Sequence, residues 1–471
     1  MIDTFRLTAE GALGLVERGE ASGAELRQAY LDAIEERDGE LHCFLRTAEA
    51  ADGHAGGVPI ALKDVISTKG VETTAGSRIL SGYVPVFDAT VAAHVKDAGL
   101  SLLGKTNTDE FAMGSSTENS AWGPTRNPWD PTRVPGGSGG GSAAAVTAGL
   151  TPWALGSDTG GSIKQPSALC GNVGLRPTYG SVSRYGVVAF ASSLDQIGPV
   201  AKTVRDVALL YSIIAGRDPR DSTTAELPQT VELPEGDSLA GLRIGVPTEL
   251  NEAEGIEPGV RAAVARAIEL AEELGAGVGE CSLPRSVRYG LPCYYLIAPA
   301  EASSNLARYD GVRYGPRADA DGYQEMVDRT RDEGFGPEPK RRIMLGTYAL
   351  SAGYYDAFYG QAQRVRTLII REHREALEQF DLLVSPTSPT VAFPIGERAA
   401  DPLAMYASDL LTIPSCLAGL PGLSIPCGLS DGLPVGLQLI GPQFGENVLF
   451  RAGHVLEQAL AFDTVPDRWR T

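Results

Sequence analysis

The sequence predicts an α/β fold in which a largely parallel or mixed sheet is covered by helices on both faces. Short apolar strands alternate with helical segments along most of the 471 residues. This alternation is typical of layered α/β domains. No internal repeat is visible, and length alone allows one large domain or two ordinary ones.

The N-terminal half supplies the first elements of this pattern. Residues 8–39 predict two helices, because apolar residues recur at helical spacing and Ser22 can act as an N-cap. The next predicted elements are a strand at 58–62, a helix at 90–99, a strand at about 101–103, a helix at 142–149, a strand at 153–158 and a helix that begins near 162.

The C-terminal half continues the alternation after one irregular stretch. Thr203 can cap a helix that runs to residue 216. Residues 217–241 are rich in Pro, Thr and Glu and predict a surface excursion rather than a domain boundary. The remaining predicted elements are strands at 242–247, 381–386, 423–428 and 435–441 and a helix at 257–275.

The composition argues against several functional classes. A formal net charge of −19 disfavours direct nucleic-acid binding, which needs a basic face to neutralise phosphates. No apolar run approaches the roughly 18–20 residues of a membrane span, and the N-terminus does not have the pattern of a signal peptide. The six cysteines lack C-x-x-C spacing, and the five histidines show no ligand spacing. We therefore expect a cytoplasmic protein with reduced thiols, no metal site and no membrane association.

Arginine supplies nearly all of the positive charge, and only seven lysines are present. This acid-rich, lysine-poor composition is typical of proteins from salt-loving organisms; an acidic surface encoded by a GC-rich genome is the alternative. Lys63 therefore stands out at the end of the apolar run VPIALK. Lysine can lose its proton when it is desolvated, whereas arginine cannot. Taken without its motif, an ion pair of Lys63 with Asp64 is the simpler interpretation.

The stretch 135–166, PGGSGGGSAAAVTAGLTPWALGSDTGGSIKQP, places two glycine-framed serines on loops. Glycine lets the backbone approach a ligand closely and turn its N–H groups toward a developing charge. Ser162 is therefore a candidate nucleophile at the start of a predicted helix. Its oxyanion hole would consist of the main-chain amides of Thr159, Gly160, Gly161 and Ser162. The structural alternatives are an N-cap role for Ser162 and a turn role for Ser138.

Residues 99–106, GLSLLGKT, match the phosphate-loop pattern G-x-x-x-x-G-K-[ST] letter for letter. A phosphate cradle needs a loop after a strand, whereas Leu-Ser-Leu-Leu predicts a strand here. The glycines at 136–141 follow a turn-rich loop rather than a strand, so they do not make a dinucleotide fingerprint either. We expect no nucleotide site at either position.

The same segments carry a family resemblance. VPIALKDV, GKTNTDEFAMGSSTENSAWGPTRNP and the glycine–serine stretch resemble the amidase signature family. Later segments, including KRRIMLGTYALSAGYYDA and MYASDLLTIPSCLAGLPGLSIPCG, are similar to the branch of that family that works in tRNA-dependent amidotransferases. The resemblance implies a single α/β/α amidase domain over residues 1–471 with an extended mixed central sheet. It also implies N-terminal helices within 1–45 and a helical insertion at 285–350 near the site.

The resemblance implies a Ser–Ser–Lys mechanism. Ser162 would be the nucleophile, Ser138, with a cis peptide bond in similar enzymes, would relay a proton, and Lys63 would be the general base. To be neutral near pH 7, Lys63 needs a pKa about three units below its usual value of about 10.4, which burial can supply. Alternation along the strand predicts that Asp64 points to the opposite face.

Two positions depart from the family pattern. Gly139 stands where relatives commonly carry a second serine, which removes one possible hydrogen bond near the relay. Lys164 replaces the usual arginine of S-I-R-x-P. We expect Asp158 and Lys164 to pin the oxyanion loop electrostatically, less rigidly than a bidentate arginine would. A base role for Lys164 is the lesser alternative to Lys63.

For the substrate, the resemblance implies Tyr294, Arg342 and Asp409. An arginine suits the α-carboxylate of glutamine, and an aspartate suits its α-ammonium group. Arg341 and Tyr295 are immediate neighbours, so the register stays open at this point. Surface salt bridges are the alternative role for these charged residues.

The activity implied by the resemblance is a glutaminase subunit whose ammonia converts Glu-tRNA(Gln) or Asp-tRNA(Asn) into the cognate amide. The implied partners are a larger tRNA-binding B subunit, which would use ATP and Mg²⁺, and a small C subunit. No cofactor is implied in this chain. A stand-alone amidase for small carboxamides, with an apolar acyl pocket, is the alternative of the same fold. An inactive scaffold is a third possibility, against which the set of Lys63, Ser138 and Ser162 argues.

Overall fold

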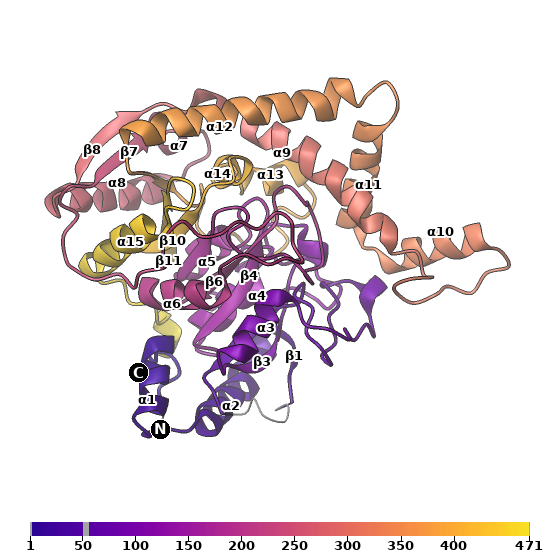
Figure 1. The fold of residues 1–471 in the computed structure, drawn as a ribbon, viewed down its shortest axis with the longest axis horizontal. Coiled ribbons are helices and arrows are strands. Elements are labelled where there is room, and N and C mark those ends of the chain that lie inside the picture. The colour runs from indigo at the N-terminus through magenta and orange to yellow at the C-terminus, as the bar shows by residue number, and fades with distance from the viewer. Residues whose placement is uncertain (1, 50–55, 471) are drawn as a thin grey trace.

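The computed structural model describes residues 2–49 and 56–470 of the predicted domain (Figure 1). Its centre is a sheet whose strands are β1 Phe44–Thr47, β2 Pro59–Lys63, β3 Ser101–Thr106, β4 Trp153–Asp158, β5 Val173–Arg176, β6 Gln196–Ala201, β7 Arg243–Pro247, β8 Gly277–Cys281, β9 Leu382–Pro386, β10 Gly422–Ser430 and β11 Leu433–Ile440. Within the described residues these 11 strands follow the order β1-β3-β2-β4-β6-β5-β10-β11-β9-β7-β8.

The sheet is mixed, which confirms the predicted fold class. β3, β2 and β4 run parallel to one another, as do β9, β7 and β8. The pairs from β4 through β6, β5, β10 and β11 to β9 are antiparallel. The predicted strands are present, whereas β1, β5, β6 and β8 are absent from the sequence-based prediction.

Helices flank the sheet on both faces. They are α1 Ala9–Glu17, α2 Gly23–Leu41, α3 Thr90–Asp97, α4 Gly140–Thr147, α5 Lys164–Cys170, α6 Val204–Ile214, α7 Thr248–Asn251, α8 Pro258–Glu273, α9 Pro284–Asn305, α10 Tyr323–Gly334, α11 Pro337–Leu350, α12 Gln361–Gln379, α13 Pro402–Ala407, α14 Ile413–Leu417 and α15 Glu446–Leu460. Short 3₁₀ turns are η1 Arg78–Leu80, η2 Glu110–Ala112, η3 Leu306–Arg308 and η5 Asp467–Trp469, and η4 Asp356–Gly360 is a π-helical turn.

The central strands are buried because helices cover both of their faces. α4 and α5 contact each other and lie against β4, β5, β6, β10 and β11, while α6, α8 and α15 form a second group on the same strands. The two predicted caps are confirmed. The Ser22 hydroxyl accepts a hydrogen bond from the Glu25 amide in a capping box, and Thr203 caps α6.

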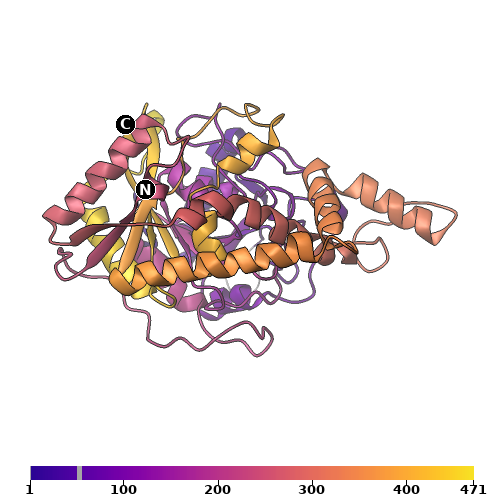
Figure 2. The same ribbon diagram turned by 90° about the horizontal axis from the view of Figure 1, so that it is seen from above.

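The segment after β8 is largely helical. α9 packs against α11, α12 and α14, and α12 lies along the top of the molecule while α10 extends from its right-hand side (Figures 1 and 2). Across the described chain, none of the helices combines the length and apolar character needed to cross a bilayer.

Candidate active site

The candidate catalytic residues lie where parallel strands end. Lys63 is the last residue of β2, and the loop that carries Ser162 follows Asp158, the last residue of β4. Because β2 and β4 are parallel neighbours, their carboxyl ends meet at one edge of the sheet. Ser138 lies in the glycine loop just before α4.

The amine of Lys63 is buried and aimed at Ser138. Lys63 Nζ donates hydrogen bonds to Ser138 Oγ at 2.7 Å and to the Ser157 carbonyl oxygen at 3.2 Å. Burial lowers the pKa of Lys63 to about 7, although Asp109 and two further carboxylates oppose the shift. The amine is therefore partly neutral near pH 7 and can accept a proton from the serine hydroxyl.

Asp64 takes no part in this contact, as the strand alternation predicts. One of its carboxylate oxygens pairs with Arg46 at 3.0 Å, and the other accepts the Thr74 amide at 2.9 Å. Lys105 lies 3.6 Å from Asp64 and donates to the Ile66 carbonyl. Lys105 belongs to β3, so the segment with the phosphate-loop pattern is a strand rather than a cradle.

The two serine loops touch through their backbones. The peptide bond between Gly137 and Ser138 is cis. The Gly139 amide donates to the Ser162 carbonyl oxygen at 3.0 Å. A Cβ atom at position 139 would lie 2.4 Å from that oxygen, so glycine permits this close approach. The structure thus brings Lys63, Ser138 and Ser162 into one site.

The oxyanion loop offers free donors. Within the described residues, no hydrogen bond uses a main-chain N–H of residues 159–162. Two hydrogen bonds to other segments fix the loop. Thr412 Oγ1 donates to the Gly160 carbonyl oxygen at 2.6 Å, and Thr159 Oγ1 donates to the Asp195 carboxylate at 2.7 Å. Gly161 has a φ of +143°, a conformation that favours glycine. Fixed amides with no internal acceptor can stabilise a developing oxyanion.

Asp158 and Lys164 share no side-chain hydrogen bond among the described residues, although, against the effect of burial, the Lys164 charge helps to hold the pKa of Asp158 below its usual value. Asp158 accepts the Ile163 and Lys164 amides at 3.1 and 3.4 Å, and its ion pair at 3.3 Å is with Arg176 of β5. The Lys164 ammonium instead donates to Ser415 Oγ at 2.8 Å and to Gln438 Oε1 at 2.9 Å. These contacts direct its amine toward α14 and β11, so the geometry favours Lys63 as the base.

The two neighbouring arginines differ in burial and in their partners. The side chain of Arg342 is 3% exposed and that of Arg341 is 44% exposed. Arg342 Nε donates to Glu338 Oε1 at 2.7 Å, and the same oxygen accepts the Tyr406 hydroxyl at 2.9 Å. Its guanidinium also lies 5.3 Å from the centre of the Tyr295 ring. Arg342 is therefore the more buried of the two arginines, and both line the same small cavity.

Tyr294 and Asp409 lie in the same region. The Tyr294 ring covers the oxyanion loop, because a Cβ atom at Gly160 would come within 2.9 Å of it. One oxygen of Asp409 accepts the Ser115 hydroxyl, and the other is buried without a partner among the described residues. Burial raises the pKa of Asp409 to about 7. A ligand cation would satisfy the free oxygen and favour the ionised carboxylate.

Several supporting residues escaped the sequence analysis. They are Asp109, Ser115, Arg176, Asp195, Glu338 and Thr412. The i, i+4 spacing of Glu338 and Arg342 on a predicted helical segment was an available signal. The other five come from distant parts of the chain, and no local pattern connects them with the serines.

Two cavities lie beside Arg342 and Glu338. A space of about 70 Å³ is lined by Arg342, Tyr406 and Ser116 among others. It shares Glu118 and Asn119 with a larger hollow of about 520 Å³. Both spaces lie between the loop that follows η2 and the start of α11, and none of the candidate catalytic residues Lys63, Ser138 and Ser162 lines either of them.

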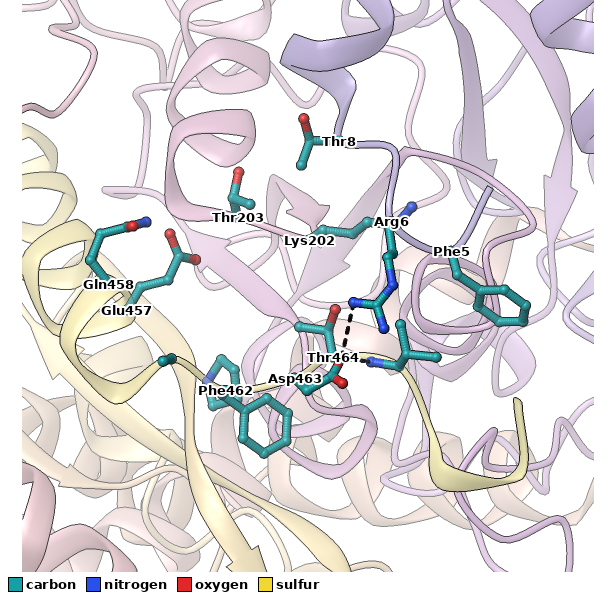
Figure 3. Close-up of a pocket in the computed structure, with 13 residues that line it drawn as sticks. Phe5, Arg6, Thr8, Lys202, Thr203, Glu457, Gln458, Phe462, Asp463 and Thr464 are labelled. Carbon is teal, nitrogen blue, oxygen red and sulfur yellow. Dashed lines mark hydrogen bonds and ion pairs between the residues drawn. The ribbon is translucent and has the colours of Figure 1, made fainter. Parts of the chain in front are cut away.

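A separate pocket of about 440 Å³ lies between the N-terminal segment and the end of α15 (Figure 3). Its lining includes Phe5, Arg6, Lys202 and Phe462, and Arg6 points toward Asp463 at 3.7 Å. None of the candidate catalytic residues lines it. Across the described part of the chain, no group of three or more side chains could hold a metal ion.

Known proteins share this sequence and fold. The family described as Amidase matches residues 26–450. The A subunit of glutamyl-tRNA(Gln) amidotransferase from Salinispora arenicola is 55% identical over 99% of this chain and 100% of its own length. The structure of the corresponding protein from Thermotoga maritima is 48% identical, has a TM-score of 0.83 and covers 97% of this chain and 96% of its own.

The fold is also shared with an amide hydrolase of another specificity. The structure of 6-aminohexanoate cyclic dimer hydrolase is 28% identical, with a TM-score of 0.86 over 100% of both chains. The architecture by itself therefore does not distinguish between these activities. The match over most of the sequence nevertheless fixes the family: this chain belongs to the amidase family.

Proposed function

We propose that this chain is the glutamine-hydrolysing A subunit of a tRNA-dependent amidotransferase. The observation that most supports glutamine as the substrate is the unpartnered oxygen of buried Asp409, which lies in the same site as Arg342. A zwitterionic amino acid needs one charge of each sign, and this pair supplies both. The relatives named as glutamyl-tRNA(Gln) amidotransferase chains support the same assignment.

The proposed chemistry begins with proton transfer. Neutral Lys63 accepts the proton of Ser138, and Ser138 accepts the proton of Ser162 as the Ser162 oxygen attacks the side-chain amide carbon of glutamine. The amides of residues 159–162 hold the oxyanion. The relay returns a proton to the leaving nitrogen, the C–N bond of the tetrahedral intermediate breaks, and ammonia departs while a γ-glutamyl ester remains on Ser162. Water then hydrolyses the ester to glutamate and regenerates Ser162.

Ammonia would pass to a tRNA-binding B subunit that uses ATP and Mg²⁺, with a small C subunit completing a cytoplasmic assembly. The net charge of −19 supports placing most tRNA contacts on that partner. The acceptor would be Glu-tRNA(Gln), Asp-tRNA(Asn) or both. This chain contributes no cofactor to the proposed reaction.

Glutaminase assays on Ser162→Ala and Lys63→Ala test the proposal. We expect each variant to lose at least about 10³-fold in kcat/KM, because the nucleophile and base act as one unit. Ser286→Ala is the matched control. Ser286 lies at the start of α9, and its hydroxyl donates a hydrogen bond to Glu372 of α12 rather than to a catalytic group. Equal glutaminase activity in the parent and both site variants would eliminate the mechanism.

A stand-alone amidase is the alternative. The shared fold with 6-aminohexanoate cyclic dimer hydrolase keeps it in view. It predicts faster hydrolysis of small uncharged amides than of glutamine, and no stable complex with a tRNA-binding subunit. A preference for glutamine, together with co-purification with that subunit, would exclude it.

A further inference from the structure

We propose that Asp109 and Thr117 are positioning residues that hold the relay serine, Ser138, between the base and the nucleophile. Both belong to the segment GKTNTDEFAMGSSTENSAWGPTRNP, which carries part of the family resemblance but takes no part in the proposed proton transfer. The inference rests on the proposed function and deepens it, because it names the residues on which the geometry of the relay depends.

Asp109 is a buried carboxylate that organises the loop after η2. It is fully buried, its Oδ2 accepts the Thr117 amide at 2.9 Å, and its Oδ1 accepts the Asn119 amide at 3.0 Å. Burial raises the pKa of Asp109 to about 6, while the two amides act in the opposite direction. The carboxylate is therefore largely ionised at pH 7, and the form that accepts both amides is the one present.

The carboxylate of Asp109 lies directly against the glycine loop. A Cβ atom at Gly137, the residue before Ser138, would lie 2.3 Å from Asp109 Oδ2 and 2.5 Å from the Ser116 amide nitrogen. A Cβ atom at Gly114 would lie 2.3 Å from Asp109 Cγ. Glycine at these two positions therefore lets the carboxylate pack one residue away from the relay hydroxyl.

Thr117 connects Asp109 to both sides of Ser138. Its hydroxyl donates to the Gly136 carbonyl oxygen at 2.8 Å and accepts the Gly140 amide at 3.1 Å. Thr117 also has a φ of +60°, a left-handed conformation that β-branched residues rarely adopt. Such a conformation persists only where its surroundings enforce it, and the bond from its amide to Asp109 is one such contact. Asp109 thus fixes Thr117, and Thr117 fixes the backbone on both sides of the relay residue.

The charge of Asp109 also acts on the base. Burial is the main cause of the lowered pKa of Lys63, and three carboxylates oppose it, Asp109 first and then Asp158 and Asp195. The Asp109 carboxyl group is itself influenced by the charges of Lys63 and Glu118. Removing the Asp109 charge should therefore lower the pKa of Lys63 further, because the protonated amine loses a nearby negative charge.

Two variants of Thr117 test the support of the relay. Thr117→Val removes the hydroxyl at almost constant shape, so kcat should fall at least about tenfold while KM for glutamine changes less than about threefold. Thr117→Ser keeps the hydroxyl and should retain kcat within about threefold of the parent. In both variants the acidic limb of the pH profile of kcat/KM should stay where the parent has it, since no charge changes.

Asp109→Asn tests the charge. Asparagine cannot accept both amides, so kcat should again fall at least about tenfold, and the acidic limb of kcat/KM should move at least about 0.5 pH unit lower. Asp206→Asn is the matched control, because Asp206 is also fully buried and accepts two main-chain amides, those of Ala9 and Glu10 at 3.1 and 2.8 Å. It should lose stability but keep the parental kcat and pH profile.

The outcomes separate this inference from the proposed function. A parent chain that does not hydrolyse glutamine, alone or with its partner subunits, overturns the proposed function and this inference with it. An active parent together with a parental kcat in Thr117→Val, or with equal losses in Thr117→Val and Thr117→Ser, overturns only this inference. An acidic limb that stays in place in Asp109→Asn, or that moves equally in Asp206→Asn, does the same.

If Asp109→Asn does not fold, the two Thr117 variants decide the question, because neither removes a buried charge. A loss of kcat in Thr117→Val that Thr117→Ser restores, at unchanged KM, supports the inference.

Discussion

The protonation of Lys63 links chemistry to stability at the scale of one residue. Burial lowers the pKa of Lys63 to about 7, whereas an exposed lysine of the unfolded chain titrates near 10.4. Between these values the unfolded chain binds the extra proton, so this group's contribution to stability rises with pH. The cost of burying the amine is full below pH 7 and vanishes above about pH 10.5.

We therefore expect Lys63→Met to be more stable than the parent by about 3 kcal/mol at pH 7, allowing for the lost hydrogen bond to Ser138. The difference should shrink steadily toward pH 10. Urea unfolding at pH 6 to 10 measures it, with Lys340→Met as the control because Lys340 is partly exposed. A difference that stays constant with pH would show that Lys63 does not change protonation over this range.

Glu338 is expected to position Arg342 rather than to act on the reacting atoms. Its carboxylate accepts Arg342 Nε at 2.7 Å and also the Tyr406 hydroxyl. Glu338→Gln removes a charge-assisted hydrogen bond, so KM for glutamine should rise about tenfold while kcat changes less than about threefold. Steady-state kinetics measure the two constants separately. A fall in kcat at unchanged KM would contradict a positioning role.

Single residues also show which parts of the site can be predicted from the sequence. Lys63 and Ser162 could be singled out as candidates because a strand end and a glycine frame define their positions, whereas the roles of all three residues, including Ser138, were implied by the family resemblance. The partner of Asp158 could not be singled out, because Arg176 belongs to β5, which no periodic pattern marked. An ion pair between side chains on different strands depends on the order of strands in the sheet, so no local sequence pattern can predict it.

At the scale of elements, the oxyanion loop depends on one glycine. A Cβ atom at Gly161 would lie 2.2 Å from Thr412 Oγ1, and the residue has a φ of +143°. Gly161→Ala should displace the loop and lower kcat about 10²–10³-fold, the effect of losing an oxyanion donor. Glutamine turnover measures this loss.

Gly432→Ala is the matched control for this loop. Gly432 also has a positive φ of +77°, but no atom lies within 4 Å of its added Cβ. This variant should lose about 1–2 kcal/mol of stability and keep its activity. Equal activity losses in the two alanine variants would show that the Thr412 contact is not what matters.

The absence of β6 from the prediction has a physical cause. β6 runs through the middle of the sheet, yet it contains Gly198 and Pro199, which are unfavourable in ordinary central strands. A Cβ atom at Gly198 would lie 2.0 Å from the Leu175 carbonyl, so the close packing of β5 requires the glycine. Tertiary packing overrides strand propensity here. In contrast, α6 and β4 lie close to their predicted bounds because capping and apolar runs specify them locally.

For the whole molecule, the net charge of −19 predicts that salt stabilises the fold. Like charges repel across the surface, and the screening length falls from about 10 Å at 0.1 M salt to about 3 Å at 1 M. Surface ion pairs such as Arg18–Glu20 weaken too, but exposed pairs contribute little to stability. The repulsion of the excess acids should therefore dominate the response to salt.

Thermal unfolding in KCl from about 0.05 to about 2 M measures this response. We expect the unfolding temperature to rise, with most of the gain below about 0.5 M, because screening then approaches its limit. Sucrose is the control, since exclusion from the protein surface stabilises in proportion to its concentration without such a limit. A falling unfolding temperature would mean that ion pairs outweigh repulsion. If the unfolding temperature rises linearly with KCl concentration, as expected for sucrose, exclusion of the solute from the protein surface explains the effect. Screening of the acidic surface would then not be the cause, and the charge would give no support for adaptation to salt.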